Sequence, residues 1–286
     1  MEGQARARFS LGRHAVTMSQ TIADRCHGVL LGLAAGDRNG GPTELAVLLA
    51  ESLAVRRAFD GEDVLARYAA RWRAGGFDAG PVAAEVLEQV ACGVPVEKAV
   101  ARADRDRDGQ TADCNPAQRS APLAMAAFLS DDMVVDCALR EAAVTHAHPL
   151  AGDVAAAVAV LCRALVRGYG WGAALSMAAR GRLPATVRAL RPATSPKQLV
   201  RGGFAPDVLH AAVHFVTVSA SFDAALTASL TFAGPANYCP VLVGSIGGAR
   251  WGAGGIRAEH LAHCRDLARV EDAGNVLATG WGAKRR

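Results

Sequence analysis

Apolar residues recur at intervals of three and four along several long stretches of this chain. Leu45, Leu48, Leu49 and Leu53 follow that spacing, which places them on one face of a helix. No alternation of apolar and polar positions, the mark of a half-buried strand, competes with it. We therefore expect helices, with the same periodicity at 82–90, 154–165, 208–216 and 241–246.

Glycine and proline fall between these stretches, where a helical bundle needs its turns. They divide the chain into roughly ten helices, without an internal repeat or a true linker. The pattern thus predicts an all-α protein with one domain. The breaking positions are 75–76, 93–95, 109, 149, 168–172, 192–196, 202–203 and 234–235.

The composition supports small-residue helix packing. Apolar residues make up 51% of the 286 positions but aromatic residues only 5%, and Ala, Val and Leu dominate. The apolar stretch 29–35 is too short to span a bilayer, so we expect no membrane association. Met18 is an alternative start, in which case residues 1–17 form a disordered extension and 18–286 form the domain.

Charge and cysteine usage exclude some classes of protein. The formal charge is only +4, and the arginines are scattered rather than arranged in a stripe with aromatic residues, so we expect no nucleic-acid partner. The seven cysteines stand singly, without a CxxC pair. An odd number of isolated cysteines argues against a disulfide framework and indicates a reducing compartment, the cytoplasm.

Several stretches, taken together and in this order, resemble the ADP-ribosylglycohydrolase family. The resemblance spans nearly everything from Cys26 to Gly252. It implies a compact, orthogonal helical bundle with a ligand cleft that holds two metal ions. The matching stretches are 28–37, ending in Gly-Asp; 44–53; 67–80; 115–124; 145–149; and the pieces 203–210, 234–239 and 244–252.

The chain departs from the family's pattern at both metal motifs. The Thr-Asp-Asp-Thr segment is absent, since only seven residues, 38–44, separate Asp37 from Leu45. Where the family has Gly-Asp-Thr-Asp-Thr, this chain reads Gly234-Pro235-Ala236-Asn237-Tyr238. Hard cations need several oxygen ligands, preferably anionic, which proline and a neutral amide do not supply. We therefore expect no di-metal centre and no other cofactor.

Without metals, hydrolysis of an N-ribosyl bond needs a carboxylate as general base or electrostatic partner. Asp37 is the first candidate and Glu44 the second, with Asp78 behind them. Each has a structural alternative. Asp37 could tie down backbone N–H groups of its turn, Glu44 could be an exposed first-turn residue, and Asp78 could cap the following helix. Within the helix, Glu51 is expected to be an ion-pair partner.

The 115–124 stretch resembles the family's ligand-cradling loop and supplies the first binding candidates. Arg119, with Asn115 and Ser120, offers a planar set of donors for a pyrophosphate or carboxylate. His146 is a candidate for a ribose hydroxyl or for orienting a loop, whereas His148 before Pro149 is expected to cap or pack. Further along, Asn237 and Tyr238 are binding candidates. Tyr238 stacks on an adenine or fills the volume that the metals vacated.

A rival interpretation is a zinc site. His210 and His214 stand one helical turn apart, and the other candidate ligands would be His260, His263 and Cys264, although nothing in the sequence joins the two groups. Two cysteines, Cys114 and Cys239, flank the matched segments. No Cys, His and Asn pattern supports either as a nucleophile.

Two functional hypotheses follow. The first is a metal-independent hydrolase that acts on the N-glycosidic bond of a small nucleotide or ADP-ribosyl substrate. The second is an inactive relative that binds an ADP-ribose-like ligand or a protein partner. The sequence leaves the oligomeric state open.

Overall fold

The computed structural model describes the backbone of residues 11–235 and 238–281, and side chains from residue 22 onward. Within these residues it contains fifteen α-helices, four short 3₁₀ helices and no strand, as the periodicity predicted. The helices are α1 (Leu11–Gly36), α2 (Gly41–Arg56), α3 (Gly61–Arg73), α4 (Pro81–Ala91), α5 (Val96–Arg105), α6 (Asn115–Arg119), α7 (Pro122–Met125), α8 (Asp131–Ala143), α9 (Pro149–Val166), α10 (Trp171–Ala178), α11 (Pro184–Ala189), η1 (Pro196–Gln198), α12 (Ala205–Val218), α13 (Phe222–Ala233), α14 (Cys239–Trp251), η2 (Ala253–Gly255), η3 (Ala258–Leu261), α15 (Leu267–Ala278) and η4 (Thr279–Trp281).

The predicted number of helices was too low. The structure adds short helices such as α6, α7, α10 and α11, which have between four and eight residues and are too short to show a periodicity. The predicted breaks do fall at helix ends. Gly93 and Gly168, which follow α4 and α9, both have φ near 86°, a left-handed conformation that favours glycine.

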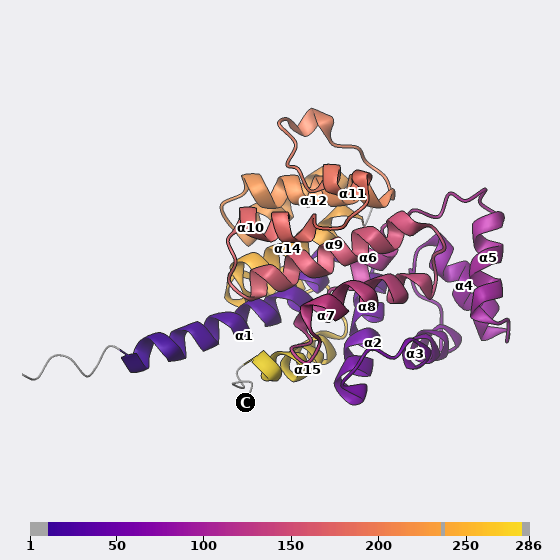
Figure 1. Ribbon diagram of the computed structural model, residues 1–286, viewed down its shortest axis with the longest axis horizontal. Helices are drawn as coiled ribbons and strands as arrows, with labels where there is room; N and C mark the ends of the chain where they lie inside the picture. Colours follow the sequence, from indigo (N-terminus) through magenta and orange to yellow (C-terminus); the bar gives the residue numbers. More distant parts are fainter. Residues whose placement is uncertain (1–10, 236–237, 282–286) are drawn as a thin grey trace, which may run out of the picture.

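Helix α9 forms the centre of the bundle and contacts α6, α7, α8, α10, α12 and α14 (Figure 1). Nearly all of its residues are buried, because Ala and Val occur on every face and neighbours surround it. Of the described helices, α9 alone is long and apolar enough to cross a membrane. However, 83% of that stretch is buried inside the fold, as in the core helix of a globular protein.

Helices α1 and α14 pack with their backbones in contact. Gly28 and Gly32 of α1 lie against Gly248 and Gly244 of α14, and a Cβ atom at Gly28 would lie 2.2 Å from the Gly248 carbonyl oxygen. The small-residue helix packing expected from the composition is therefore confirmed at the contact between α1 and α14. Because α1 ends directly before Asp37, a residue of the cleft described below, this contact helps to fix the framework of that region.

The described helices share one large core, and a small second cluster joins α4 to α5. Figure 1 shows α3, α4 and α5 gathered at one end of the molecule. Helix α1 begins at Leu11, so residues 11–17 of the proposed extension are helical, and residues 1–10 lie outside the described residues. The domain boundary at residue 18 stays a prediction.

Candidate functional site

The structure places both candidate catalytic residues in one cleft of about 520 Å³. Its walls are the α1–α2 turn with the start of α2, the α3–α4 loop, and the segment from His263 to the first turn of α15. Asp37, Glu44 and Asp78 all line it. Residues far apart in the sequence therefore meet here.

Asp37 holds the turn that enters α2. Its carboxylate accepts hydrogen bonds from the backbone N–H groups of Asn39 at 3.1 Å, Gly40 at 2.9 Å and Thr43 at 2.7 Å. The residue is only 2% exposed. This geometry is the turn-stabilising alternative considered for Asp37, and it engages both carboxylate oxygens.

Glu44 belongs to a group of charged side chains that ties three helices together. Its Oε1 atom lies 3.2 Å from Arg71 Nε on α3 and 2.8 Å from Arg269 Nη1 on α15. Arg269 also binds Glu51, with Nε 2.6 Å from Oε1. We call Glu44, Glu51, Arg71 and Arg269 the charged latch.

Two predictions about the charged latch can be compared with the structure. Glu44 does lie in the first turn of α2, but the alternative of an exposed residue was wrong, because two guanidinium groups cover it and leave it 8% exposed. The ion-pair role expected of Glu51 is confirmed. The hydrogen bonds to Glu51 and then Glu44 raise the pKa of Arg269 above its ordinary value.

Asp78 does not cap α4 as predicted. The N-cap residue is Gly80, with φ 80°, and no side chain caps the helix. Asp78 instead accepts a hydrogen bond from the Asn39 side chain at 2.7 Å and one from the Gly80 backbone at 3.3 Å. It is exposed and forms no ion pair within the described part of the chain. Among the three candidate carboxylates, it alone presents its charge to solvent.

The two glycines at the start of α2 explain how Asp78 reaches the cleft. A Cβ atom at Gly41 would lie 1.7 Å from the Asp78 carbonyl oxygen, so the α3–α4 loop rests directly on the helix backbone. Gly40 has φ 84°, which lets the chain turn sharply out of α1.

Arg119 lies in the core instead of in the cleft. Its side chain and that of Glu141 are both 0% exposed, and Nε lies 2.6 Å from Glu141 Oε1. Arg119 Nη2 also donates to Thr145 Oγ1 at 2.7 Å, while the Tyr68 hydroxyl donates to the same Glu141 oxygen. This core pair, Arg119 and Glu141, leaves no exposed surface for the ligand contact expected of Arg119. Burial, together with the Glu141 carboxylate, raises the pKa of Tyr68.

His146 extends this buried network. Its Nδ1 atom lies 2.7 Å from Thr145 Oγ1, and its Nε2 atom lies 2.7 Å from Asp113 Oδ1. The residue lines a second, more open cavity of about 990 Å³ beside α3, α5 and α8, apart from Asp37 and Glu44. Of its two predicted roles, loop orientation fits these contacts. His148 caps α9 as expected, accepting the Leu150 N–H at 3.2 Å.

Asn115 and Ser120 are both buried around α6. Ser120 Oγ donates to the Ala155 carbonyl at 3.4 Å. The Asn115 carboxamide fits its surroundings when its NH₂ group faces Asp113, and its side chain packs on Gly80. Asn115 thus supports the loop that carries Asp78, although it does not line the cleft.

Tyr238 packs outside the cleft, and Asn237 lies outside the described residues. The Tyr238 ring covers Gly203, and its carbonyl accepts a hydrogen bond from Gln118 at 3.0 Å. Burial raises the pKa of the Tyr238 hydroxyl. Stacking of Tyr238 on an adenine and filling of a volume vacated by the metals both stay predictions.

The proposed zinc ligands do not come together. His214 faces the Ala193 carbonyl, His263 faces the Ala34 and Asp37 carbonyls, and His260 faces Asp223. All seven cysteines are free thiols. Burial raises the pKa of both Cys114 and Cys239, which opposes thiolate formation and a nucleophilic role.

Comparison with known proteins identifies the family. The model of the ADP-ribosylglycohydrolase family matches residues 42–285. This chain belongs to the ADP-ribosylglycohydrolase family. A solved structure described as an ADP-ribosylglycohydrolase-related protein complex is 24% identical, with a TM-score of 0.72 over 91% of this chain and 99% of that one, which supports the fold. No curated protein matches.

Membership in the ADP-ribosylglycohydrolase family supports a hydrolase-like function. The loss of the family's metals stays a prediction, and the contacts of two described carboxylates bear on it. Asp37 already accepts three N–H groups, and Glu44 shares its charge with two guanidinium groups. A divalent cation would therefore meet arginines where it needs available oxygen ligands.

Several residues of this family member's cleft were missed by the sequence analysis: Asn39, Arg71, Phe77, Arg265 and Arg269. Arg265 and Arg269 are four residues apart, a spacing typical of one helix face, but an i, i+4 arginine pair alone does not indicate a ligand. His263 was considered only as a zinc ligand. In the structure it joins the cleft wall to the α1–α2 turn.

Proposed function

We propose that the cleft binds an ADP-ribosyl or other nucleotide-derived ligand and hydrolyses its N-glycosidic bond without a metal ion. The observation that carries this proposal is Asp78, an exposed carboxylate in a cleft whose other sequence-derived candidates, Asp37 and Glu44, are engaged in the scaffold.

The cleft also offers groups that suit the rest of such a ligand. Arg265 is exposed and has no ion-pair partner in the part of the chain that the structure describes. Its planar guanidinium matches a pyrophosphate. The half-buried ring of Phe77, which meets Trp72 edge-on at 5.4 Å, offers an apolar surface for a base.

In the proposed reaction, the bond between the ribose C1′ and the leaving nitrogen breaks, and the electron pair stays on that nitrogen. Water adds to the oxocarbenium-like C1′ and gives its proton to Asp78. The leaving nitrogen takes up one proton, which balances the proton that Asp78 accepts and later releases. The products are the ribose-bearing fragment with a C1′ hydroxyl, ADP-ribose for an ADP-ribosyl substrate, and the aglycone with an N–H group. Asn39, which donates a hydrogen bond to Asp78 at 2.7 Å, would hold the carboxylate in place.

The second candidate is ligand binding without turnover. The engagement of both Asp37 and Glu44 favours it, since the residues that the family resemblance first suggested for catalysis serve the scaffold. A cytoplasmic location, the absence of a nucleic-acid partner and the identity of the small-molecule ligand stay predictions for both candidates.

Two measurements test these candidates. Isothermal titration with ADP-ribose should show binding that is equal in Mg²⁺ and in EDTA. Hydrolysis of a panel of N-ribosyl substrates should fall by about 10²-fold or more in Asp78→Asn. Asp132→Asn, an exposed Asp on α8 away from the cleft, is the matched control and should keep full activity.

The outcomes separate the candidates. Binding without turnover on the whole panel would favour the non-catalytic candidate. Turnover that survives in Asp78→Asn would remove Asp78 from the mechanism. Strict dependence on Mg²⁺, or a failure to bind ADP-ribose and related nucleotides, would contradict the proposal.

A further inference from the structure

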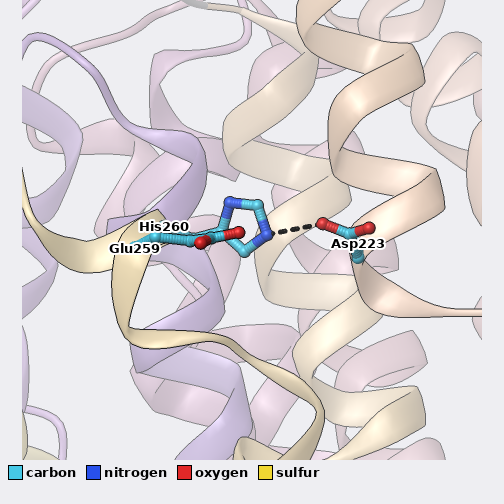
Figure 2. Close-up of side chains that lie close together, drawn as sticks. All are labelled: Asp223, Glu259 and His260. Atoms are coloured by element: carbon cyan, nitrogen blue, oxygen red, sulfur yellow. Dashed lines mark hydrogen bonds and ion pairs between the residues drawn. The ribbon is translucent and has the colours of Figure 1, made fainter.

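A second group of chemically active side chains lies away from the cleft, at the start of α13. Asp223 comes from the first turn of that helix, and Glu259 and His260 come from η3. Figure 2 shows the His260 ring directed at the Asp223 carboxylate, with Glu259 beside it. His260 Nε2 lies 2.8 Å from Asp223 Oδ1, and one potential ligand atom from each residue lies within 4.8 Å of the others. We propose that these three residues bind one Zn²⁺ ion.

The donor set and its spacing suit zinc. An imidazole nitrogen and two carboxylate oxygens are common zinc ligands, and water can take a remaining position. Two donors on a tetrahedral zinc lie roughly 3.4 Å apart. The contact between His260 and Asp223 therefore needs to open by less than about 1 Å. The set is also specific within the chain, since no other three His, Cys, Asp or Glu residues in the described ranges come as close.

The imidazole is already oriented for this role. His260 is partly buried and packs edge-on against the Phe222 ring, with a distance of 6.1 Å between centroids. A ligand held by packing loses little conformational freedom when the ion binds. Glu259, in contrast, is exposed and can adjust to the ion.

Arg257 presently supplies the positive charge of this cluster. Its guanidinium contacts Asp223 and lies 2.8 Å from Glu259 Oε1. The arginine side chain is 58% exposed, and ion pairs this exposed are weak. Zinc, with two positive charges and direct bonds to the ligands, would displace the guanidinium into solvent. Arg257 is thus a competitor, and its removal should leave zinc binding equally strong or stronger.

The position of the cluster indicates what the ion would do. It would fasten η3 to the start of α13 through Asp223 and His260, which are 37 positions apart in sequence. Directly after η3 the chain enters the cleft wall with His263 and Arg265. A zinc ion here would brace that wall from outside the cleft. This inference stands on its own contacts and does not depend on the proposed hydrolysis.

The test is a titration of the full chain with Zn²⁺ after treatment with EDTA and dialysis, followed by calorimetry and by the melting temperature. We expect one ion per chain and a higher melting temperature. Affinity should fall at least tenfold in His260→Ala and in Glu259→Gln, and should be equal or higher in Arg257→Gln. His210→Ala, which removes a histidine of α12 outside the cluster, should change nothing.

Glu259→Gln protects this test against misfolding, because the side chain is 64% exposed. A chain that binds no zinc, or binds it equally well in both ligand variants, would overturn the proposal. Weaker zinc binding in Arg257→Gln would also overturn it, since the guanidinium would then support the site and not compete for it.

Discussion

The charged latch and the core pair both join a carboxylate on one helix to a guanidinium on another, but they differ in their access to water. Arg71 and Arg269 of the charged latch are each 35% exposed at the cleft. Arg119 and Glu141 of the core pair are fully buried. The first group lies where a ligand can reach it, and the second is closed off by α3, α6 and α8.

This difference shows that burial decides what a charged residue can do. The sequence suggested Arg119 as a ligand contact and gave no role to Arg265 or Arg269. In the structure, Arg119 is buried away from the cleft, whereas Arg265 and Arg269 line it. A buried pair is costly to form, because both charges leave water, but breaking it is costlier still, since one charge is left alone. An exposed pair costs little to form and little to break, since both charges stay in contact with water.

The strongest test of the comparison is removal of one member of the core pair. We expect Arg119→Met to lower the free energy of unfolding by about 3 to 5 kcal/mol, because Glu141 would stay buried without its partner. Urea unfolding followed by circular dichroism measures this. The double variant with Glu141→Leu should recover much of the loss. Equal stability of Arg119→Met and the unmodified chain would show that water reaches the pair.

The next effect concerns the turn that enters α2, in the same cleft as the charged latch. Asp37→Ala removes the acceptor of three backbone N–H groups at the start of α2 and should cost about 1 to 2 kcal/mol. Asp37→Asn keeps one side-chain acceptor and should cost less. If Asp37 were mainly catalytic, Asp37→Ala would abolish turnover and leave the unfolding midpoint unchanged.

A smaller effect is expected in the charged latch. Arg269→Met should lower stability by roughly 1 kcal/mol or less, because the pairs are partly exposed. The difference should shrink further in 1 M salt, which screens such pairs. Arg102→Met, which removes an arginine from an exposed pair on α5, is the control for loss of a surface charge. A loss of stability as large as that of Arg119→Met would mean that the charged latch is shielded from water as completely as the core pair.

The fold was predictable because it depends on local periodicity. The spacing of Leu45, Leu48, Leu49 and Leu53 predicted α2, and the breakers marked helix ends correctly. The site was only partly predictable. Asp37 and Glu44 were placed near a cleft by resemblance to the family, and they do line one. Their partners were not visible, because Arg269 lies more than two hundred residues away in sequence. An ion pair between residues so far apart produces no regular spacing in the sequence from which it could be predicted.

The smallest expected effect is the response of the latch's neighbour, Asp63, to acid. A hydrogen bond from Arg67, which also reaches Glu51, is the main cause that lowers the pKa of Asp63 from 3.8 to about 2. A lowered carboxyl pKa stabilises the folded state above the ordinary value, and that stabilisation is lost as the pH falls from 3.8 towards 2. Melting temperatures between pH 5 and pH 2 should therefore fall less steeply in Asp63→Asn. Parallel curves for the two chains would mean that Asp63 contributes nothing, and that acid acts on other groups of the fold.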